Sequence, residues 1–173
     1  MKKIIKLLVA ITFIVSSLTS LADTSIKADV VYGHKDGMAL VYDVITPGNA
    51  NGAAVVFMVS GGWYSRWSPP ESRVEQFSHF LDAGFTLIPV HHGSAPRYHV
   101  PDAYADVSRA IRHIKMHAGQ HGIDADRIGV TGGSAGGHLS LMLGLDSDQG
   151  DPNAREEVMR QSNDVAAIVA YFP

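Results

Sequence analysis

One serine of this chain stands between glycines, at the point where a short apolar run meets a second apolar run. The surrounding sequence is Val130-Thr131-Gly132-Gly133-Ser134-Ala135-Gly136-Gly137-His138, which contains the pattern Gly-x-Ser-x-Gly. Between a strand and a helix, this pattern is typical of a nucleophile elbow, a sharp turn that exposes a serine hydroxyl above a sheet. The pattern therefore predicts that Ser134 is the nucleophile of a serine hydrolase. A glycine-rich turn without chemistry is the alternative.

A nucleophilic serine also needs amide donors for the negative charge that develops on the attacked carbonyl oxygen. The first predicted donor is the amide of Ala135, directly after the nucleophile and at the start of a helix whose dipole favours negative charge. The other predicted donors are the amides of Gly61 and Gly62, in the loop after the apolar run 53–59. Glycine there lets the backbone approach a ligand closely. Together these amides form the predicted oxyanion hole.

Aromatic residues near this loop are candidates for the substrate pocket. Trp63, Tyr64 and Trp67 follow the predicted oxyanion loop, where they would form a wall against an acyl or aryl group. Tyr98 follows His91 and His92, which end a predicted strand, and ligands gather at the carboxyl ends of strands in open α/β sheets. The alternatives are core packing for the aromatic cluster and, for the two histidines, a polar loop that satisfies the strand ends.

No obvious base for Ser134 follows it in this chain. His138 is the only later histidine, and one helical turn further on its ring would lie along the helix rather than reach the serine hydroxyl. We expect it to be a buried, hydrogen-bonded helix residue. Five further histidines are expected to be solvated on turns or helices: His34, His79, His113, His117 and His121. The acidic residues between 146 and 164 are expected to form a solvated loop and not a calcium site.

The elements that would position these residues alternate between strand-like and helix-like patterns. After a hairpin around Lys35-Asp36-Gly37, with strands at 30–32 and 40–45, the patterns predict strands at 53–59, 85–90, 127–131 and 165–171 and helices at 70–83, 101–118 and 135–145. This alternation implies an α/β fold with a doubly wound, mostly parallel sheet. The strand at 165–171 and the helix at 135–145 are expected to be buried. On the helix at 101–118, the charged residues are expected mostly to face water: Asp102, Asp106, Arg109, Arg112 and Lys115.

These residues resemble the esterases and lipases of the α/β-hydrolase fold that are related to hormone-sensitive lipase, especially their bacterial exported members. The resemblance covers about residues 30–173 and is carried by Ser60-Gly61-Gly62-Trp63, by Asp124-Ala125-Asp126-Arg127-Ile128 and by the elbow. The loop departs from the family's His-Gly-Gly-Gly pattern. Val59 or Ser60 takes the histidine position, depending on the register, so that either Ser60 or Trp63 replaces a glycine.

The resemblance implies a carboxylic ester hydrolase that works through an acyl-enzyme on Ser134, needs no metal or cofactor and acts on a small-molecule ester. It also implies the order Ser, then Asp or Glu, then His, and no histidine follows an acidic residue after Ser134. We therefore expect residues 23–173 to be the N-terminal part of a single α/β-hydrolase domain, inactive without the rest. A prolyl-peptidase-like enzyme of the same fold and a truncated or degenerate non-catalytic protein are the alternatives.

The composition fits a single globular domain, with 173 residues, 46% of them hydrophobic and 18% charged. Residues 1–22 combine three lysines, a short apolar run and the small residues Ser20 and Ala22, which predicts a signal peptide and export to the periplasm or the medium. The run is shorter than the ~20 residues that span a bilayer, so no stable membrane insertion is expected after cleavage. Without these residues the net charge falls from −3 to −6, which argues against a nucleic-acid partner. The absence of cysteine excludes a thiol nucleophile and disulfides.

Overall fold

A computed structural model describes residues 24–173 of the chain, and the predicted signal peptide lies outside this range. Six strands form one sheet in the order β1-β2-β4-β3-β5-β6. They are β1 (Ser25–Lys35), β2 (Met38–Thr46), β3 (Ala54–Met58), β4 (Thr86–Val90), β5 (Ile128–Gly133) and β6 (Ala167–Tyr171). The hairpin β1-β2 is antiparallel and joins β4 in antiparallel fashion, whereas β4, β3, β5 and β6 run parallel to one another. The predicted doubly wound, mostly parallel sheet is confirmed.

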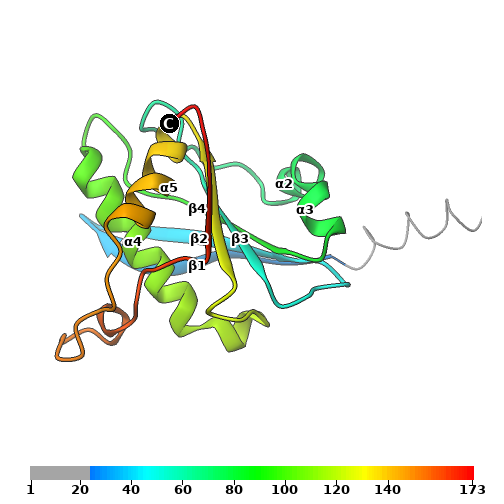
Figure 1. Cartoon of the computed structure of the whole chain (residues 1–173). Coiled ribbons are helices and arrows are strands. Elements are labelled where there is room, and N and C mark those ends of the chain that lie inside the picture. The colour runs from blue at the N-terminus through cyan, green and yellow to red at the C-terminus, as the bar shows by residue number, and fades with distance from the viewer. Residues whose placement is uncertain (1–23) are drawn as a thin grey trace, which may run out of the picture.

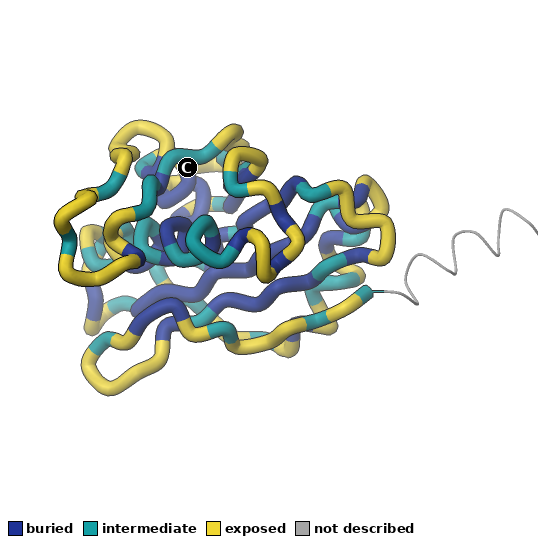
Figure 2. Tube along the Cα trace, turned by 90° about the horizontal axis from the view of Figure 1, so that it is seen from below, coloured by how far each residue is buried: buried dark blue, intermediate teal, exposed yellow. Residues whose placement is uncertain are grey.

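Helices cover both faces of the sheet (Figure 1). On one face lie α4 (Val100–Met116) and α5 (Ala135–Leu145), and on the other lie the short helices α2 (Glu71–Gln76) and α3 (Ser78–Asp82). Two 3-10 turns, η1 (Ala118–His121) and η2 (Glu157–Arg160), complete the helical segments. The larger core lies beneath α4 and α5, and the smaller one joins Phe77 and Leu81 to the opposite face. The buried parts of the chain follow the strands and the inner sides of the helices (Figure 2).

Most predicted elements are found with small changes of their ends, but β1, predicted at 30–32, extends over Ser25–Lys35, and the helix predicted at 70–83 is broken. The chain leaves helical geometry at Phe77, with φ −117° and ψ 24°, and α3 begins at the next residue. The Phe77 ring is buried and lies 4.6 Å from the ring of Phe57 on β3. The break therefore coincides with the point where this ring packs onto the sheet.

The last strand is also different from its prediction, because β6 is largely exposed. Ile168, Val169 and Tyr171 keep 37%, 50% and 55% of their surface accessible. Among residues 24–173, β6 pairs with β5 alone, so within this range its apolar side chains are covered only in part. The apolar run correctly predicted a strand, but the prediction that this strand is buried was wrong, because the same sequence pattern fits both a central strand and an edge strand. The α5 helix, in contrast, buries Leu139 and Leu143 fully, although Leu145 is exposed.

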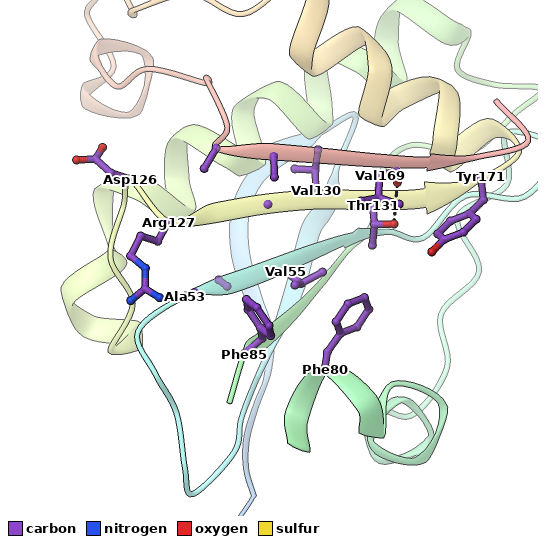
Figure 3. Close-up of a pocket in the computed structure, with 14 residues that line it drawn as sticks. Ala53, Val55, Phe80, Phe85, Asp126, Arg127, Val130, Thr131, Val169 and Tyr171 are labelled. Atoms are coloured by element: carbon purple, nitrogen blue, oxygen red, sulfur yellow. Dashed lines mark hydrogen bonds between the residues drawn. The ribbon is translucent and has the colours of Figure 1, made fainter. Parts of the chain in front are cut away.

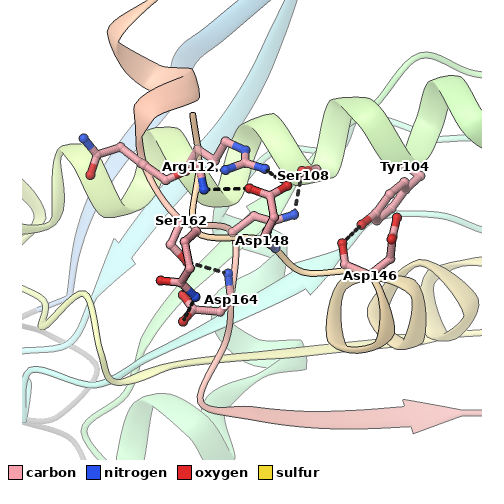
Figure 4. Close-up of polar contacts among 11 residues, drawn as sticks. Tyr104, Ser108, Arg112, Asp146, Asp148, Ser162 and Asp164 are labelled. Atoms are coloured by element: carbon pink, nitrogen blue, oxygen red, sulfur yellow. Dashed lines mark hydrogen bonds and ion pairs between the residues drawn. The ribbon is translucent and has the colours of Figure 1, made fainter. Parts of the chain in front are cut away.

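The charged face of α4 was predicted to meet water, and it is instead largely covered. Asp106 and Arg112 are buried, at 4% and 3% exposure. Lys35 of the hairpin lies 2.6 Å from Asp106, and Arg112 lies 2.6 Å from Asp148 in the acidic segment 146–164. This segment runs along α4 (Figure 4), and it makes further ion pairs from Glu156 to Arg109 and from Asp164 to Lys115. The acidic residues are thus the counter-charges of α4, which the helical pattern alone does not reveal.

Candidate active site

The sheet brings the two predicted halves of the site to one edge. β3 has β4 as its neighbour on one side and β5 on the other, so the strand order reverses at β3. Ligands of open α/β sheets bind at such a reversal, outside the carboxyl ends of the strands. β3 and β5 are parallel, and the loop with Gly61 and Gly62 follows β3 while Ser134 follows β5. The amide of Gly136 donates a hydrogen bond of 3.3 Å to the carbonyl of Ser60, which joins the two segments directly.

Ser134 has the backbone of a nucleophile elbow. Its φ is +52° and its ψ is −124°, a region that side chains rarely adopt and that is held by surrounding structure. The Ser134 amide donates to the carbonyl of Tyr171 on β6 at 2.8 Å, and the side chain is exposed. Within residues 24–173, no side chain hydrogen-bonds to its hydroxyl. The turn therefore presents the oxygen to solvent, as attack on a carbonyl requires.

Two glycines of the motif make the turn possible. A Cβ on Gly132 would lie 2.5 Å from the backbone carbon of Gly136, and a Cβ on Gly136 would lie 2.6 Å from the carbonyl oxygen of Met58. Both contacts are shorter than real Cβ contacts and involve backbone, which cannot move aside. The glycines are thus required because β5, α5 and β3 meet within a few ångströms of the serine.

The loop after β3 forms a tight turn from Gly61 to Tyr64. The Gly61 amide donates to the Tyr64 carbonyl at 3.1 Å, and the Tyr64 amide donates to the Gly61 carbonyl at 3.0 Å. The two central residues, Gly62 and Trp63, have φ values of +57° and +67°, as in type I′ turns. Trp63 thus adopts a conformation that favours glycine, at a position where the family pattern allows one.

The hydrogen bonds of the turn show which of the predicted oxyanion donors are already engaged. The amide of Gly61 is engaged inside the turn, whereas the amides of Gly62 and Ala135 make no hydrogen bond within residues 24–173. Ala135 is also the first residue of α5, so the positive end of the helix dipole lies beside the serine. Gly62 and Ala135 are therefore the two predicted donors that remain available for an oxyanion.

The predicted pocket residues lie in three different places. Trp63 is half-buried, and its ring meets the ring of His138 edge-on at 5.4 Å. Tyr64 is 45% exposed and lines a hollow with Ser60 and Gly61. Tyr98 is buried, donates to Asp36 at 3.0 Å and lines another hollow with Trp67 and His91. Tyr64 and Trp67 are thus surface residues beside the turn and not part of the core.

His138 was expected to be a buried, hydrogen-bonded residue, and this expectation is wrong. Its side chain is exposed and packs against Trp63 without a hydrogen bond in the described part of the chain. The reason is that residue 138 falls on the exposed side of α5, where its ring contacts the Trp63 ring. It lies beside the elbow, and within residues 24–173 it makes no hydrogen bond to the Ser134 hydroxyl.

Three of the histidines predicted to be solvated surround a core tyrosine instead. The hydroxyl of Tyr42 lies 3.0 Å from Nδ1 of His113 and 2.9 Å from Nε2 of His121, and the ring of His117 stacks on His113 at 4.2 Å. His121 is buried, and His113 and His117 are half-buried. They are covered because η1 folds back beside α4 and over β2.

His91 and His92 follow directly after β4, and both are buried. Their rings reach two serines, Ser60 and Ser65, on either side of the turn. The two histidines therefore provide hydrogen-bond partners for polar loop residues at the strand ends, which was the alternative to a pocket role. They also line the hollow with Tyr98. Neither serine was predicted as a site residue. The available signal was a serine on each side of Gly61–Tyr64, together with two adjacent histidines at the end of a strand.

A hollow of about 450 Å³ lies elsewhere, on the α3 side of β3, β5 and β6 (Figure 3). Phe80, Phe85 and Val169 give it an apolar lining, and Thr131 donates to the carbonyl of Val169 at 2.8 Å. Neither Ser134 nor the turn borders it. This hollow is the thinly covered face of the sheet rather than the predicted catalytic site.

Residues 24–173 hold no group of three or more histidine, cysteine or acidic side chains placed to bind a metal ion. In the same range, no helix has the length and apolar character needed to cross a bilayer. The carboxyl edge of the sheet thus presents an exposed serine and two amides without another acceptor. Arg66 and Arg73 line the hollow beside the turn. An exposed hydroxyl next to free amide donors suits nucleophilic attack on a carbonyl group.

The sheet order, the elbow and the adjacent glycine turn define a protein of the α/β-hydrolase fold. Residues 42–173 match the BD-FAE family model, and the chain belongs to that family. The region with the site is therefore wholly within the matched residues.

Two related proteins are named as ester hydrolases. The chain is 32% identical over 120 residues to a protein named probable carboxylic ester hydrolase LipM of Mycobacterium tuberculosis, covering 69% of this chain and 27% of LipM. It is 28% identical to esterase LipQ of the same organism, covering 84% of this chain and 34% of LipQ. The chain thus spans about a quarter to a third of the length of these relatives.

Solved structures show the same arrangement. Esterase 2 of Thermogutta terrifontis with bound butyrate is 27% identical, with a TM-score of 0.65, over 86% of this chain and 52% of that structure. An acetyl ester-xyloside bifunctional hydrolase from Caldicellulosiruptor lactoaceticus has a TM-score of 0.68 at 23% identity, over 82% of this chain and 55% of that structure. The second likeness concerns the fold alone.

Proposed function

We propose that the complete protein is a serine carboxylesterase that hydrolyses small esters through an acyl-enzyme on Ser134. The observation that carries the proposal is the exposed hydroxyl of Ser134 on a strained turn, next to the unengaged amides of Ala135 and Gly62. The esterase relatives and the butyrate-bound structure support an ester rather than a peptide as substrate.

In this mechanism, the Ser134 oxygen attacks the ester carbonyl while a base takes its proton, and the negative charge moves to the carbonyl oxygen. The amides of Gly62 and Ala135 donate to that oxygen, aided by the dipole of α5. The intermediate expels the alcohol, which takes up the proton from the base. In the second half, the base takes a proton from water, the water oxygen attacks the acyl-serine, and the proton returns to the Ser134 oxygen as the acid is released. Since no side chain of residues 24–173 bonds to the Ser134 hydroxyl, we infer that the base and its acid partner come from other residues.

The test is hydrolysis of p-nitrophenyl acetate and butyrate by the complete protein and by its Ser134→Ala variant, beside a chromogenic prolyl peptide. We expect ester hydrolysis that falls at least about 10³-fold in Ser134→Ala, because the nucleophile is lost. Ester hydrolysis that survives the substitution, or cleavage of the peptide alone, would contradict the proposal. Circular dichroism of both proteins controls for the fold.

We further propose that residues 1–22 are a signal peptide and that the protein works in the periplasm or outside the cell. The support is the sequence of these residues, which are basic at the start and then apolar. Intact mass of the protein from its native host tests this proposal. A mature form that begins at Asp23 is expected, and a form that keeps residues 1–22 would refute it.

A further inference from the structure

The Gly61–Tyr64 turn is held on both sides by serines that bond to the histidine pair at the end of β4. Ser60 precedes the turn, and its Oγ lies 2.8 Å from Nε2 of His92. Ser65 follows the turn, and its Oγ lies 3.1 Å from Nδ1 of His91 and accepts from the amide of His92 at 3.2 Å. These bonds fix the two ends of the segment that contains Gly62.

The partners determine which ring nitrogens carry protons. Nδ1 of His92 lies 2.8 Å from the carbonyl oxygen of Gly93, and a carbonyl only accepts, so Nδ1 must donate. In the neutral ring, Nε2 is then an acceptor, and the Ser60 hydroxyl donates to it. The Ser65 hydroxyl, which accepts from the amide of His92, has its own proton free to donate to His91.

Burial supports neutral rings at both positions. It lowers the pKa of His91 to about 4, with Arg73 and His92 adding to the effect, and it also lowers the pKa of His92. The pKa of His92 is raised by its bond to the Gly93 carbonyl and by Asp106, and lowered by Lys35. Near neutral pH, Nε2 of His92 therefore remains available as an acceptor for Ser60.

Ser60 connects three elements at the carboxyl edge of the sheet. It follows β3 in sequence, and its side chain bonds to His92, the second residue after β4. Its carbonyl accepts from Gly136, in the first turn of α5, at 3.3 Å. Gly136 is one residue from Ala135, and Ser60 is two residues from Gly62. The position of Ser60 therefore sets how the amide of Gly62 lies relative to the amide of Ala135.

We propose that His92 is a positioning residue for the oxyanion hole, which it holds in place by accepting the hydroxyl of Ser60. This inference rests on the proposed function, since it concerns the same reaction. His92 does not touch the substrate. Its contribution is the placement of the Gly62 amide, and small errors in placement are costly because oxyanion donors act over about 3 Å.

The test compares Ser60→Ala, His92→Phe and His92→Gln in the complete protein, with p-nitrophenyl butyrate at a temperature well below unfolding. Ser60→Ala and His92→Phe should each lower kcat about 10-fold or more and leave KM within about twofold, because substrate binding is not affected. His92→Gln keeps an acceptor for Ser60 and should recover most of kcat. The double variant Ser60→Ala/His92→Phe should be no slower than the slower single variant, because both changes break the same bond.

The matched control is His113→Phe, which removes another histidine that bonds to a hydroxyl but lies away from the elbow. It should lower the melting temperature and leave kcat unchanged. An unchanged kcat in Ser60→Ala, or losses that multiply in the double variant, would overturn the positioning role. If His92→Phe does not fold, Ser60→Ala decides the question. A wild-type protein without Ser134-dependent hydrolysis would instead refute the proposed function, and the inference with it.

Discussion

Two groups of histidines in residues 24–173 are buried or half-buried, and they differ in what they bond to. His91 and His92 lie at the carboxyl end of β4 and bond to the serines that bracket the Gly61–Tyr64 turn. The second group, His113, His117 and His121, lies along α4 and η1, where two of its members bond to the hydroxyl of Tyr42. The first group is thus connected to the predicted oxyanion hole and the second to the core.

The comparison shows that a lowered histidine pKa does not by itself mark an active site. Burial lowers the pKa of His91, His113 and His121 to about 4 in each case, although only His91 is near the elbow. What separates the groups is their place on the sheet, because β4 ends at the edge where the strand order reverses and ligands bind. We therefore expect changes near the first group to reduce turnover and changes near the second to reduce stability.

The largest effect should come from Gly136→Ala, which disturbs the edge that the first group supports. The new Cβ would lie 2.6 Å from the carbonyl oxygen of Met58, so that β3 and α5 must separate. We expect a loss of about 2–4 kcal/mol in the free energy of unfolding and at least a 100-fold loss of ester hydrolysis, measured by urea unfolding and p-nitrophenyl butyrate turnover.

The matched control is Gly119→Ala in η1, beside the second group. A Cβ there meets no atom within 4 Å, so stability and turnover should both stay close to those of the wild type. Equal losses in the two variants would remove the distinction between the two regions.

A second, smaller effect is the dependence of stability on pH that the Tyr42 group predicts. The pKa values of His113 and His121 are about 4 in the folded chain, against about 6.5 when unfolded. As the pH falls from about 6.5 to 4, the unfolded chain takes up protons that the folded chain does not, and stability is lost. The loss should be on the order of 1 kcal/mol for His113, which is half-buried, and larger for His121, which is buried.

Urea unfolding between pH 4 and pH 7 measures this loss. His121→Gln should reduce the slope of stability against pH, although it also weakens the core, whereas His79→Gln, at an exposed position, should leave the slope unchanged. A slope that His121→Gln does not alter would show that other groups control acid sensitivity.

The smallest effect should come from Lys115→Met. Lys115 lies between His113 and His117 in sequence but bonds to Asp164, and this bond together with that from Ser162 lowers the pKa of Asp164 to about 2. The Asp164 side chain is 46% exposed and that of Lys115 is 10% exposed. Water therefore screens the acidic end of the pair, and methionine keeps most of the packing of the lysine stem, so the loss in stability should be less than ~1 kcal/mol. Thermal unfolding in low and high salt measures it. A loss above about 2 kcal/mol would mean that the acidic segment stabilises α4 more than its exposure allows.

The sequence predicted the sheet, the hairpin, α4, α5 and the elbow, because each has a local signature. Alternating or continuous apolar runs and the Gly-x-Ser-x-Gly pattern depend on residues that are neighbours in the chain. The strained backbone of Ser134 follows from the same local pattern.

The features that the sequence did not predict depend on contacts between distant segments. The buried Arg112 has its counter-charge in Asp148, which is 36 positions away in the sequence. The covered His121 bonds to Tyr42, which is 79 positions away. The engagement of the Gly61 amide depends on a turn in which Trp63 takes a positive φ, which its side chain disfavours. Likewise, the bonds of His91 and His92 to Ser60 and Ser65 arise only when β3 and β4 lie side by side.

The most direct test of the account is reaction of the complete, folded protein with a fluorophosphonate probe, followed by peptide mass spectrometry. We predict a single phosphonyl adduct on the oxygen of Ser134 and none in the Ser134→Ala variant, because the elbow makes this hydroxyl the reactive one. Adducts on other residues only, or equal labelling of the variant, would contradict the central claim that Ser134 is the nucleophile.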